Sequence, residues 1–223
     1  MLSLFLIPSF ALLACTFTVV LGQSNQVCDT KSGICLQQVF ENNTKLSFGL
    51  ALPTELKGDG IFGNDFLANI TVPLPYGFEG IQSTLSSFHV RGIIPFMGGR
   101  LSSNGSYEDF QIVQYSEVSA DGQTLLPVGG ATITISPLSF WNDDFNVFVF
   151  RCQNCTLTAQ APTSGIPKLT AVASQAQPTF AELGATTATL PLAGAVTAPF
   201  SVNLSAARSA SYNDILQAAG VRG

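Results

Sequence analysis

Charge is scarce in this chain, and so are the residues that most often carry chemistry. Asp, Glu, Lys and Arg make up 10% of the 223 residues, and there are one histidine, two methionines and one tryptophan. A disordered protein would show high charge and low hydrophobicity instead, so we expect a packed core. The net charge is −5 and no run of Lys or Arg occurs, which argues against a nucleic-acid-binding protein.

Catalytic motifs are also missing. The sequence contains no GxSxG nucleophile elbow, no HExxH zinc motif and no glycine-rich phosphate loop. His89 is the only histidine, whereas zinc and copper sites usually take two or more. Asp143 and Asp144 lie in a turn-forming stretch, which indicates a turn rather than the facing carboxylates of a glycosidase. These absences argue against hydrolytic catalysis and favour a non-catalytic role.

Only one long hydrophobic run is present, and it covers residues 2–21. Its position favours a secretory signal peptide over residues 1–22; a membrane anchor is the alternative, because about 20 apolar residues can span a bilayer. We expect residues 23–218 to form a single domain and residues 219–223 to form a tail. The mature protein is then expected in the extracellular space or the cell wall, without a membrane anchor.

The cysteines fit an extracellular chain. Cys15 would leave with the signal peptide, and four cysteines remain. Pairing of Cys28 with Cys35 and of Cys152 with Cys155 is the simplest of three connectivities. Each disulfide would close a short loop and add at most about 2.5 kcal/mol by the chain-entropy estimate. A redox-active Cys-x-x-Cys and a four-cysteine zinc site are the alternatives.

Five glycosylation sequons add to the case for export. They begin at Asn42, Asn69, Asn104, Asn154 and Asn203. Asn154 lies inside the Cys-x-x-Cys loop, so a glycan there would require that loop to face solvent. Since sequons also match by chance, we expect only part of the set to be used.

Short alternating apolar stretches separated by turn residues recur along the chain. They cover residues 45–53, 66–74, 86–91, 110–118, 131–136 and 145–150. Such spacing, with almost no helical periodicity, predicts an all-β fold, an antiparallel immunoglobulin-like β-sandwich. Residues 92–97 are apolar, but Pro95 argues against a central strand there. We expect at most a short helix within residues 205–218.

Residues 161–200 allow two structural interpretations. It is rich in Ala, Thr and Pro and nearly free of charge, which is compatible with a flexible linker. Residues 168–173 and 199–204 nevertheless have the composition of strands. Both interpretations stay open from the sequence alone.

Five motifs occur in an order that resembles a known family. They are CDTKSGIC (28–35), FGLALP (48–53), YGFEG (76–80), FVFRCQNC (148–155) and FSVNLSAARSASY (200–212). Together they resemble the secreted cytochrome domain of fungal cellobiose dehydrogenases, a branch of the DOMON superfamily. The resemblance implies a β-sandwich that holds a b-type haem between loops at one end. It also implies electron transfer from a flavin domain to a copper oxygenase.

The haem-ligand positions implied by this resemblance are substituted. The family's methionine falls near Ser87, and its histidine falls at Arg208. Neither side chain ligates haem iron, so the resemblance predicts a fold without its cofactor. His89, two residues beyond Ser87, is a candidate substitute ligand because it would share a strand face with that position. Met97 is a weaker candidate on what is expected to be another segment.

Two functional hypotheses follow. The first is a non-catalytic binding module without haem, with a small-molecule or carbohydrate ligand of unknown identity. Arg208 would then either grip an anionic group of the ligand or be a solvated residue at a helix start. The second is an extracellular electron-transfer protein with haem b on His89 and a redox partner.

Overall fold

The computed structural model describes residues 25–58, 61–86, 89–101, 107–118, 124–127, 129–155, 157, 167–180 and 188–222. Within these ranges it describes the backbone alone for residues 84–86, 89–92, 96–101, 107–110 and 116–118. None of the helices in this part of the chain reaches the length and hydrophobicity that crossing a bilayer requires.

One sheet, called here the first sheet, holds eight strands. They are β1 (Asn25–Cys28), β2 (Cys35–Phe40), β3 (Ser47–Pro53), β4 (Ile61–Pro73), β9 (Thr132–Ile135), β10 (Phe140–Trp141), β11 (Phe145–Gln153) and β16 (Arg208–Ser209). The main path runs β1-β2-β3-β4-β11-β10, while β9 pairs with β11 and β16 pairs with β3. Only the β16–β3 pair among these is parallel.

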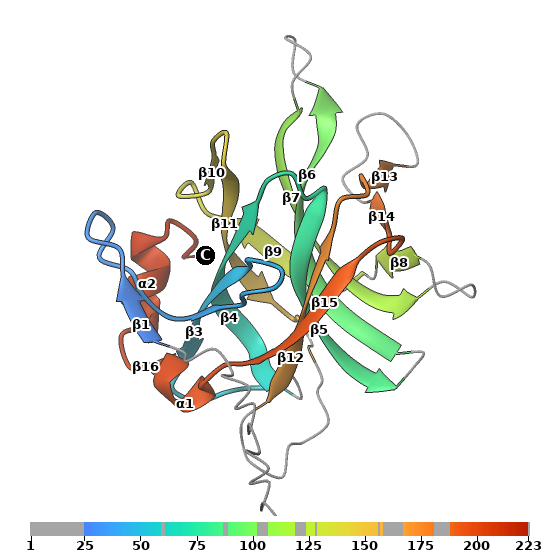
Figure 1. Cartoon of the computed structure of the whole chain (residues 1–223). Helices are drawn as coiled ribbons and strands as arrows, with labels where there is room; N and C mark the ends of the chain where they lie inside the picture. Colours follow the sequence, from blue (N-terminus) through green and yellow to red (C-terminus); the bar gives the residue numbers. More distant parts are fainter. Residues whose placement is uncertain are drawn as a thin grey trace, which may run out of the picture.

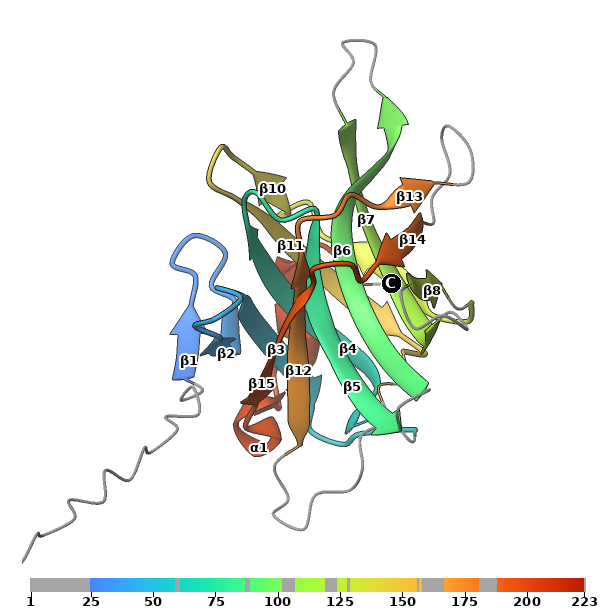
Figure 2. The same ribbon diagram turned by 45° about the vertical axis from the view of Figure 1, so that its right-hand side comes forward.

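The second sheet also holds eight strands. They are β5 (Phe78–Ser86), β6 (His89–Leu101), β7 (Tyr107–Val118), β8 (Thr124–Pro127), β12 (Lys168–Ser174), β13 (Thr179–Phe180), β14 (Ala188–Pro191) and β15 (Val196–Ser201). Their order is β13-β14-β8-β7-β6-β5-β12-β15. Figures 1 and 2 show the two sheets facing each other. The predicted antiparallel β-sandwich is confirmed.

The main core lies between the sheets and is rich in phenylalanine. Inward-facing residues of β3, β4, β11, β12 and β15 form one buried cluster. Phe48 contacts Phe62 and Phe200 with ring centroids 6.0 Å apart in each case, and Phe62 contacts Phe66 at 5.2 Å. The alternation seen in the sequence arises because every second residue of these strands enters this core.

Two short helices follow the last long strand, α1 (Leu204–Ala207) and α2 (Tyr212–Ala218). α2 packs on the outer face of the first sheet, where Tyr212 and Leu216 join Leu67 and Val149 in a second buried cluster (Figure 1). Residues beyond α2 continue this contact, since Ala219 and Val221 are buried in the same cluster. The stretch expected to be a tail is therefore packed through residue 221.

Both locally paired disulfides, Cys28–Cys35 and Cys152–Cys155, are confirmed. The first closes the β1–β2 hairpin, and the second joins Cys152 in β11 to Cys155 in the turn that follows this strand. With all four cysteines in disulfides, a four-cysteine zinc site is excluded. Asn154, between the second pair, is exposed with φ +57°, as a solvent-facing turn requires.

One open expectation about strands is confirmed in part, and another needs correction. Residues 168–173 lie in β12 and residues 199–201 lie in β15, so these parts of the Ala/Thr/Pro-rich stretch are packed sheet, as the strand interpretation predicts. Pro95, which argued against a central strand, lies within β6 between β5 and β7. The proline is tolerated because the pairing of β6 with β5 ends at Ile93, and Pro95 faces a ladder partner only on the β7 side.

Candidate functional site

The two family ligand positions map to the same end of the sandwich. β3 runs to Pro53, β4 starts at Ile61 and β5 ends at Ser86, so these strand ends meet there. Ser87 lies outside the described residues, between Ser86 and His89, whose backbones pair with each other. Arg208 begins β16 and pairs with Leu52 near the end of β3 (Figure 1). We call this region the ligand end.

Arg208 does not enter the sandwich. Its side chain is exposed and its backbone forms the C-cap of the one-turn helix α1. Of the two sequence interpretations, this placement favours a solvated residue over a group that reaches an interior ligand.

His89 and Met97 lie on the same strand rather than on two segments. Both belong to β6, eight residues apart. At about 3.3 Å per residue, their Cα atoms are about 26 Å apart along the strand. The expectation that Met97 lies on another segment than His89 is therefore wrong, and at this separation one iron atom cannot bind both residues as axial ligands.

Apolar side chains occupy the space between the sheets at the ligand end. Leu52, Phe62, Leu157, Phe200 and Val202 all belong to the main core, and none is more than 2% exposed. None of these side chains can ligate iron. The described residues at this end therefore do not fit a six-coordinate haem.

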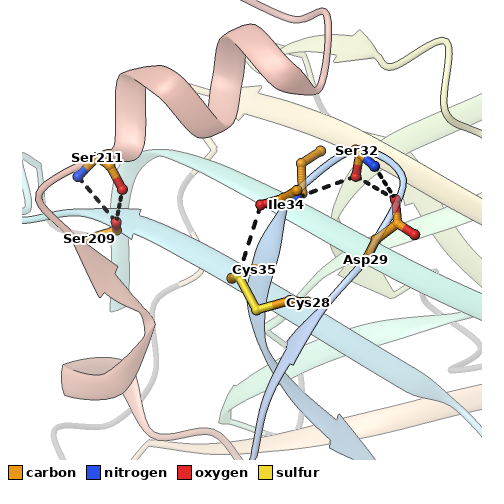
Figure 3. The surroundings of a disulfide bond; sticks show 8 residues. Cys28, Asp29, Ser32, Ile34, Cys35, Ser209 and Ser211 are labelled. Carbon is orange, nitrogen blue, oxygen red and sulfur yellow. Dashed lines mark hydrogen bonds between the residues drawn. A yellow bond between two sulfur atoms is a disulfide. The ribbon is translucent and has the colours of Figure 1, made fainter.

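A groove lies elsewhere, on the outer face of the first sheet. It has a volume of about 790 Å³. Its floor is formed by β2, β4 and β11, its walls by the β1–β2 hairpin and by Leu138 and Phe140, and α2 closes one end through Ala218. Figure 3 shows the disulfide-bonded hairpin and α2 next to each other. We call this feature the outer groove.

Asn69 lies in the floor of the outer groove. In the register of the sheet it stands between Gly49 of β3 and Val149 of β11. Its Oδ1 atom is shielded from solvent and has no hydrogen-bond partner. A buried acceptor without a partner is costly and requires an explanation.

Asn69 is also one of the predicted glycosylation sites, and we expect it to remain unmodified. Asn69 lies in the middle of β4 between two paired strands and is only partly exposed, so a glycan on its Nδ2 would have to fit among the side chains of the groove floor. Asn42 and Asn154, in contrast, are exposed. Peptide mapping of the secreted protein should find glycans at Asn42 or Asn154 and none at Asn69; a fully occupied Asn69 would contradict this prediction.

A second unpartnered group lies in the main core. Glu79 of β5 is 0% exposed, and neither carboxyl oxygen has a hydrogen-bond partner. Burial raises the pKa of Glu79 to about 8; the nearby Thr44 hydroxyl opposes this shift and the Glu41 carboxylate adds to it. Glu79 is therefore held as a neutral acid at the end of the sandwich opposite the ligand end.

Comparison with known proteins identifies the fold. No protein-family model matches the chain, and neither does any curated protein. Solved structures do match the chain, and two of them match over 88% of its length, each at 20% identity and with 96% of the other chain covered. They are the cytochrome b domain of pyranose dehydrogenase from Coprinopsis cinerea (TM-score 0.64) and the cytochrome domain of cellobiose dehydrogenase from Myriococcum thermophilum (TM-score 0.61). The chain has the fold of a cytochrome b domain.

The cytochrome-domain fold confirms the resemblance drawn from the five motifs, although at this identity it shows the fold alone. The sequence did not predict the outer groove, Asn69 as an unpartnered acceptor, or Glu79 as a buried acid. Glu79 carried one signal: it stands two residues before Ile81 in a strand whose alternate residues face the core.

Proposed function

We propose that this protein is a secreted, non-catalytic binding module built on the cytochrome-domain fold, and that it does not take up haem. The observation that carries this proposal is the separation of its only candidate ligands. The chain holds one histidine, His89, and apart from Met1 one methionine, Met97. Because they lie about 26 Å apart on one strand, a histidine–methionine pair cannot form on one haem.

Two further observations support the proposal. The ligand position at Arg208 carries an exposed cation. The described interior of the ligand end is occupied by core side chains such as Phe62 and Phe200. Secretion is supported by the apolar run at residues 2–21 and by two disulfides, which persist in oxidising compartments.

An absorption spectrum tests the proposal directly. The protein is secreted from a host supplied with haem, and its spectrum is recorded before and after dithionite. We expect no Soret band above the background of a His89→Ala variant, together with cooperative thermal unfolding. The control is a domain of the same fold that carries its haem, processed in parallel.

The contrary result has a defined meaning. A strong Soret band that disappears in His89→Ala would show an electron-transfer cytochrome that uses His89 as an axial ligand. Sharp α and β bands after reduction would show a second ligand besides, and the proposal would be abandoned.

A further inference from the structure

We propose that Glu41, Thr44 and Glu79 form a proton-controlled latch between the two sheets. While Glu79 carries its proton, the turn between β2 and β3 (residues 41–46, called here the latch turn) stays closed against β5. Loss of that proton opens the latch turn while the rest of the sandwich stays folded. This inference goes beyond the proposed function and does not depend on whether the protein takes up haem.

The surroundings of Glu79 provide no partner for a charge. The residue is 0% exposed, and neither of its carboxyl oxygens has a hydrogen-bond partner. Both flanking strands present apolar residues at this point, with Ala173 of β12 opposite Glu79 and Ile94 of β6 beside Gly80. Among the described residues, the charged group that acts on Glu79 is Glu41, which has the same sign. An ionised Glu79 would be a buried, uncompensated charge, which is far less favourable than the neutral acid.

Glu41 holds the latch turn together from within. Its carboxylate accepts hydrogen bonds from the backbone N–H groups of Asn43 at 3.0 Å and Thr44 at 2.7 Å, and from their side chains at 3.0 and 2.9 Å. The Glu41 backbone N–H donates to the Leu46 carbonyl at 2.8 Å and closes the base of the turn. Burial opposes ionisation of Glu41, but the hydrogen bonds lower its pKa overall. Glu41 is therefore already ionised when Glu79 titrates.

Thr44 couples the two carboxyl groups. Its side chain is 0% exposed and lies close enough to Glu79 to act on it. The hydroxyl has a single hydrogen, which it donates to Glu41 Oε2, and its oxygen accepts from the Leu46 N–H at 3.3 Å. A protonated Glu79 can donate to the lone pair that remains on this oxygen. An ionised Glu79 would instead compete with Glu41 for the one hydrogen and repel it at the same time.

The latch turn is a segment that can open by itself. Lys45 has φ +66°, a left-handed conformation that residues with a side chain rarely adopt, and opening the turn releases it. Three of the six residues, Asn42, Asn43 and Lys45, are exposed. Opening therefore exposes few buried side chains, and it requires less free energy than unfolding of the sandwich.

The direction of the pH dependence follows from proton linkage. In the opened turn Glu79 reaches water and has its ordinary pKa of 4.5, whereas in the closed form burial raises its pKa to about 8. Between these values opening releases a proton, so the equilibrium constant for opening rises about tenfold per pH unit. Above about pH 8 both forms are ionised, and the rise levels off.

Native-state hydrogen exchange of the whole secreted chain tests the inference. The reporters are the amides of Thr44 and Leu46, which donate inside the latch turn, and buried amides of β11 report unfolding of the sandwich. After correction for the intrinsic exchange rate, we expect the opening constant of the turn amides to rise about tenfold per unit from about pH 5 to 8 and then level off. A low urea concentration should leave this opening unchanged, because it exposes little surface, while it speeds exchange in β11.

Three variants assign the effect to the latch. Glu79→Gln stays neutral, so its latch turn should remain closed with an opening constant that does not change with pH. The matched control Glu55→Gln alters an exposed glutamate and should keep the rise. Glu41→Gln keeps an acceptor for the turn but removes the second negative charge. Its rise should level off at a lower pH, because the pKa of Glu79 falls when the like charge is gone.

Four outcomes would overturn the inference. They are an opening constant of the turn amides that is independent of pH in the unmodified protein, a rise that persists in Glu79→Gln, a rise that levels off at the same pH in Glu41→Gln, and turn amides that exchange only together with β11. Thermal unfolding confirms that each variant is folded. If Glu79→Gln fails to fold, the pH profiles of the unmodified protein and of Glu41→Gln still decide the question.

Discussion

Replacing Asp65 with alanine is expected to lower the free energy of unfolding by about 3 kcal/mol. Asp65 accepts two hydrogen bonds from Arg151, from Nε at 2.9 Å and from Nη2 at 2.8 Å, and one from the Tyr212 hydroxyl at 3.1 Å. The Arg151 side chain is 9% exposed, and its guanidinium would lose its carboxylate partner. Removing one partner of such a pair costs more than the pair contributes, because a shielded charge is left behind.

The loss of stability in Asp65→Ala should extend beyond β11. Arg151 also donates to the Val221 carbonyl at 3.4 Å, and Tyr212 begins α2. Asp65 therefore joins the first sheet to the C-terminal segment that covers its outer face. Hydrogen exchange should show α2 opening in Asp65→Ala before the rest of the sandwich.

Two controls separate charge from packing in this prediction. Asp143→Ala removes an exposed turn carboxylate and should change the free energy of unfolding, measured with urea, by less than about 0.5 kcal/mol. Asp65→Asn keeps an acceptor for Tyr212, so its free energy of unfolding should lie between those of Asp65→Ala and Asp143→Ala. If Asp65→Ala proved as stable as Asp143→Ala, the network would have no structural importance.

Arg151 illustrates how much of this fold was open to prediction. The FVFRCQNC motif predicted a buried strand and a local disulfide, because Val and Phe fill sheet faces and two cysteines three residues apart can close only a short loop. Both are confirmed. The partner of Arg151 was not predicted, since Asp65 is 86 residues away and nothing local distinguishes it from the other acidic residues.

Met97 shows a different limit. The proline at 95 divided one 13-residue strand into two expected segments, and this division left room for a His89–Met97 ligand pair. Whether a strand tolerates proline depends on which of its two sides has a paired neighbour at that residue. For residue 95 this depends on the pairing of β6 with β5 and β7, which no local sequence pattern reveals.

The outer groove combines residues that no local pattern links. Its lining comes from the β1–β2 hairpin, β4, Leu138 and Phe140, β11 and α2. Alternation predicts which residues of each strand face outward, but not that β1 and β10 flank the same sheet face. The sequon at Asn69 is a local pattern, whereas the place of Asn69 in the groove floor follows from the pairing of β4 with β3 and β11.

The stability of this protein is expected to fall as the pH rises from about 5 to about 8, and Glu79 is the reason. In the unfolded chain Glu79 has an ordinary pKa of 4.5, whereas in the folded protein burial raises it to about 8. Between these values the unfolded chain has released a proton that the folded protein still holds. Each pH unit in this window therefore costs about 1.4 kcal/mol of unfolding free energy.

The stability that Glu41 contributes has the opposite pH dependence, and it changes at lower pH. Burial alone would raise its pKa, but hydrogen bonds from the Thr44 and Asn43 backbone and from their side chains lower it overall. Its contribution is present above the ordinary glutamate pKa and is lost as the pH falls through the lowered value. Because Glu79 lowers the stability above pH 4.5 and the contribution of Glu41 is lost below it, we expect maximal stability at about pH 5.

Glu79→Gln separates this explanation from a general pH effect. The amide stays neutral, so the variant should lose the decline between pH 5 and pH 8 and be more stable than the unmodified protein at pH 8, by on the order of 3 kcal/mol. At pH 5 the variant should be about as stable as the unmodified protein, because the carboxyl group that it replaces is already largely neutral there. Urea unfolding at both pH values measures this difference. The exposed Glu55→Gln variant should keep the original slope, and a Glu79→Gln variant that also kept it would show that another group titrates.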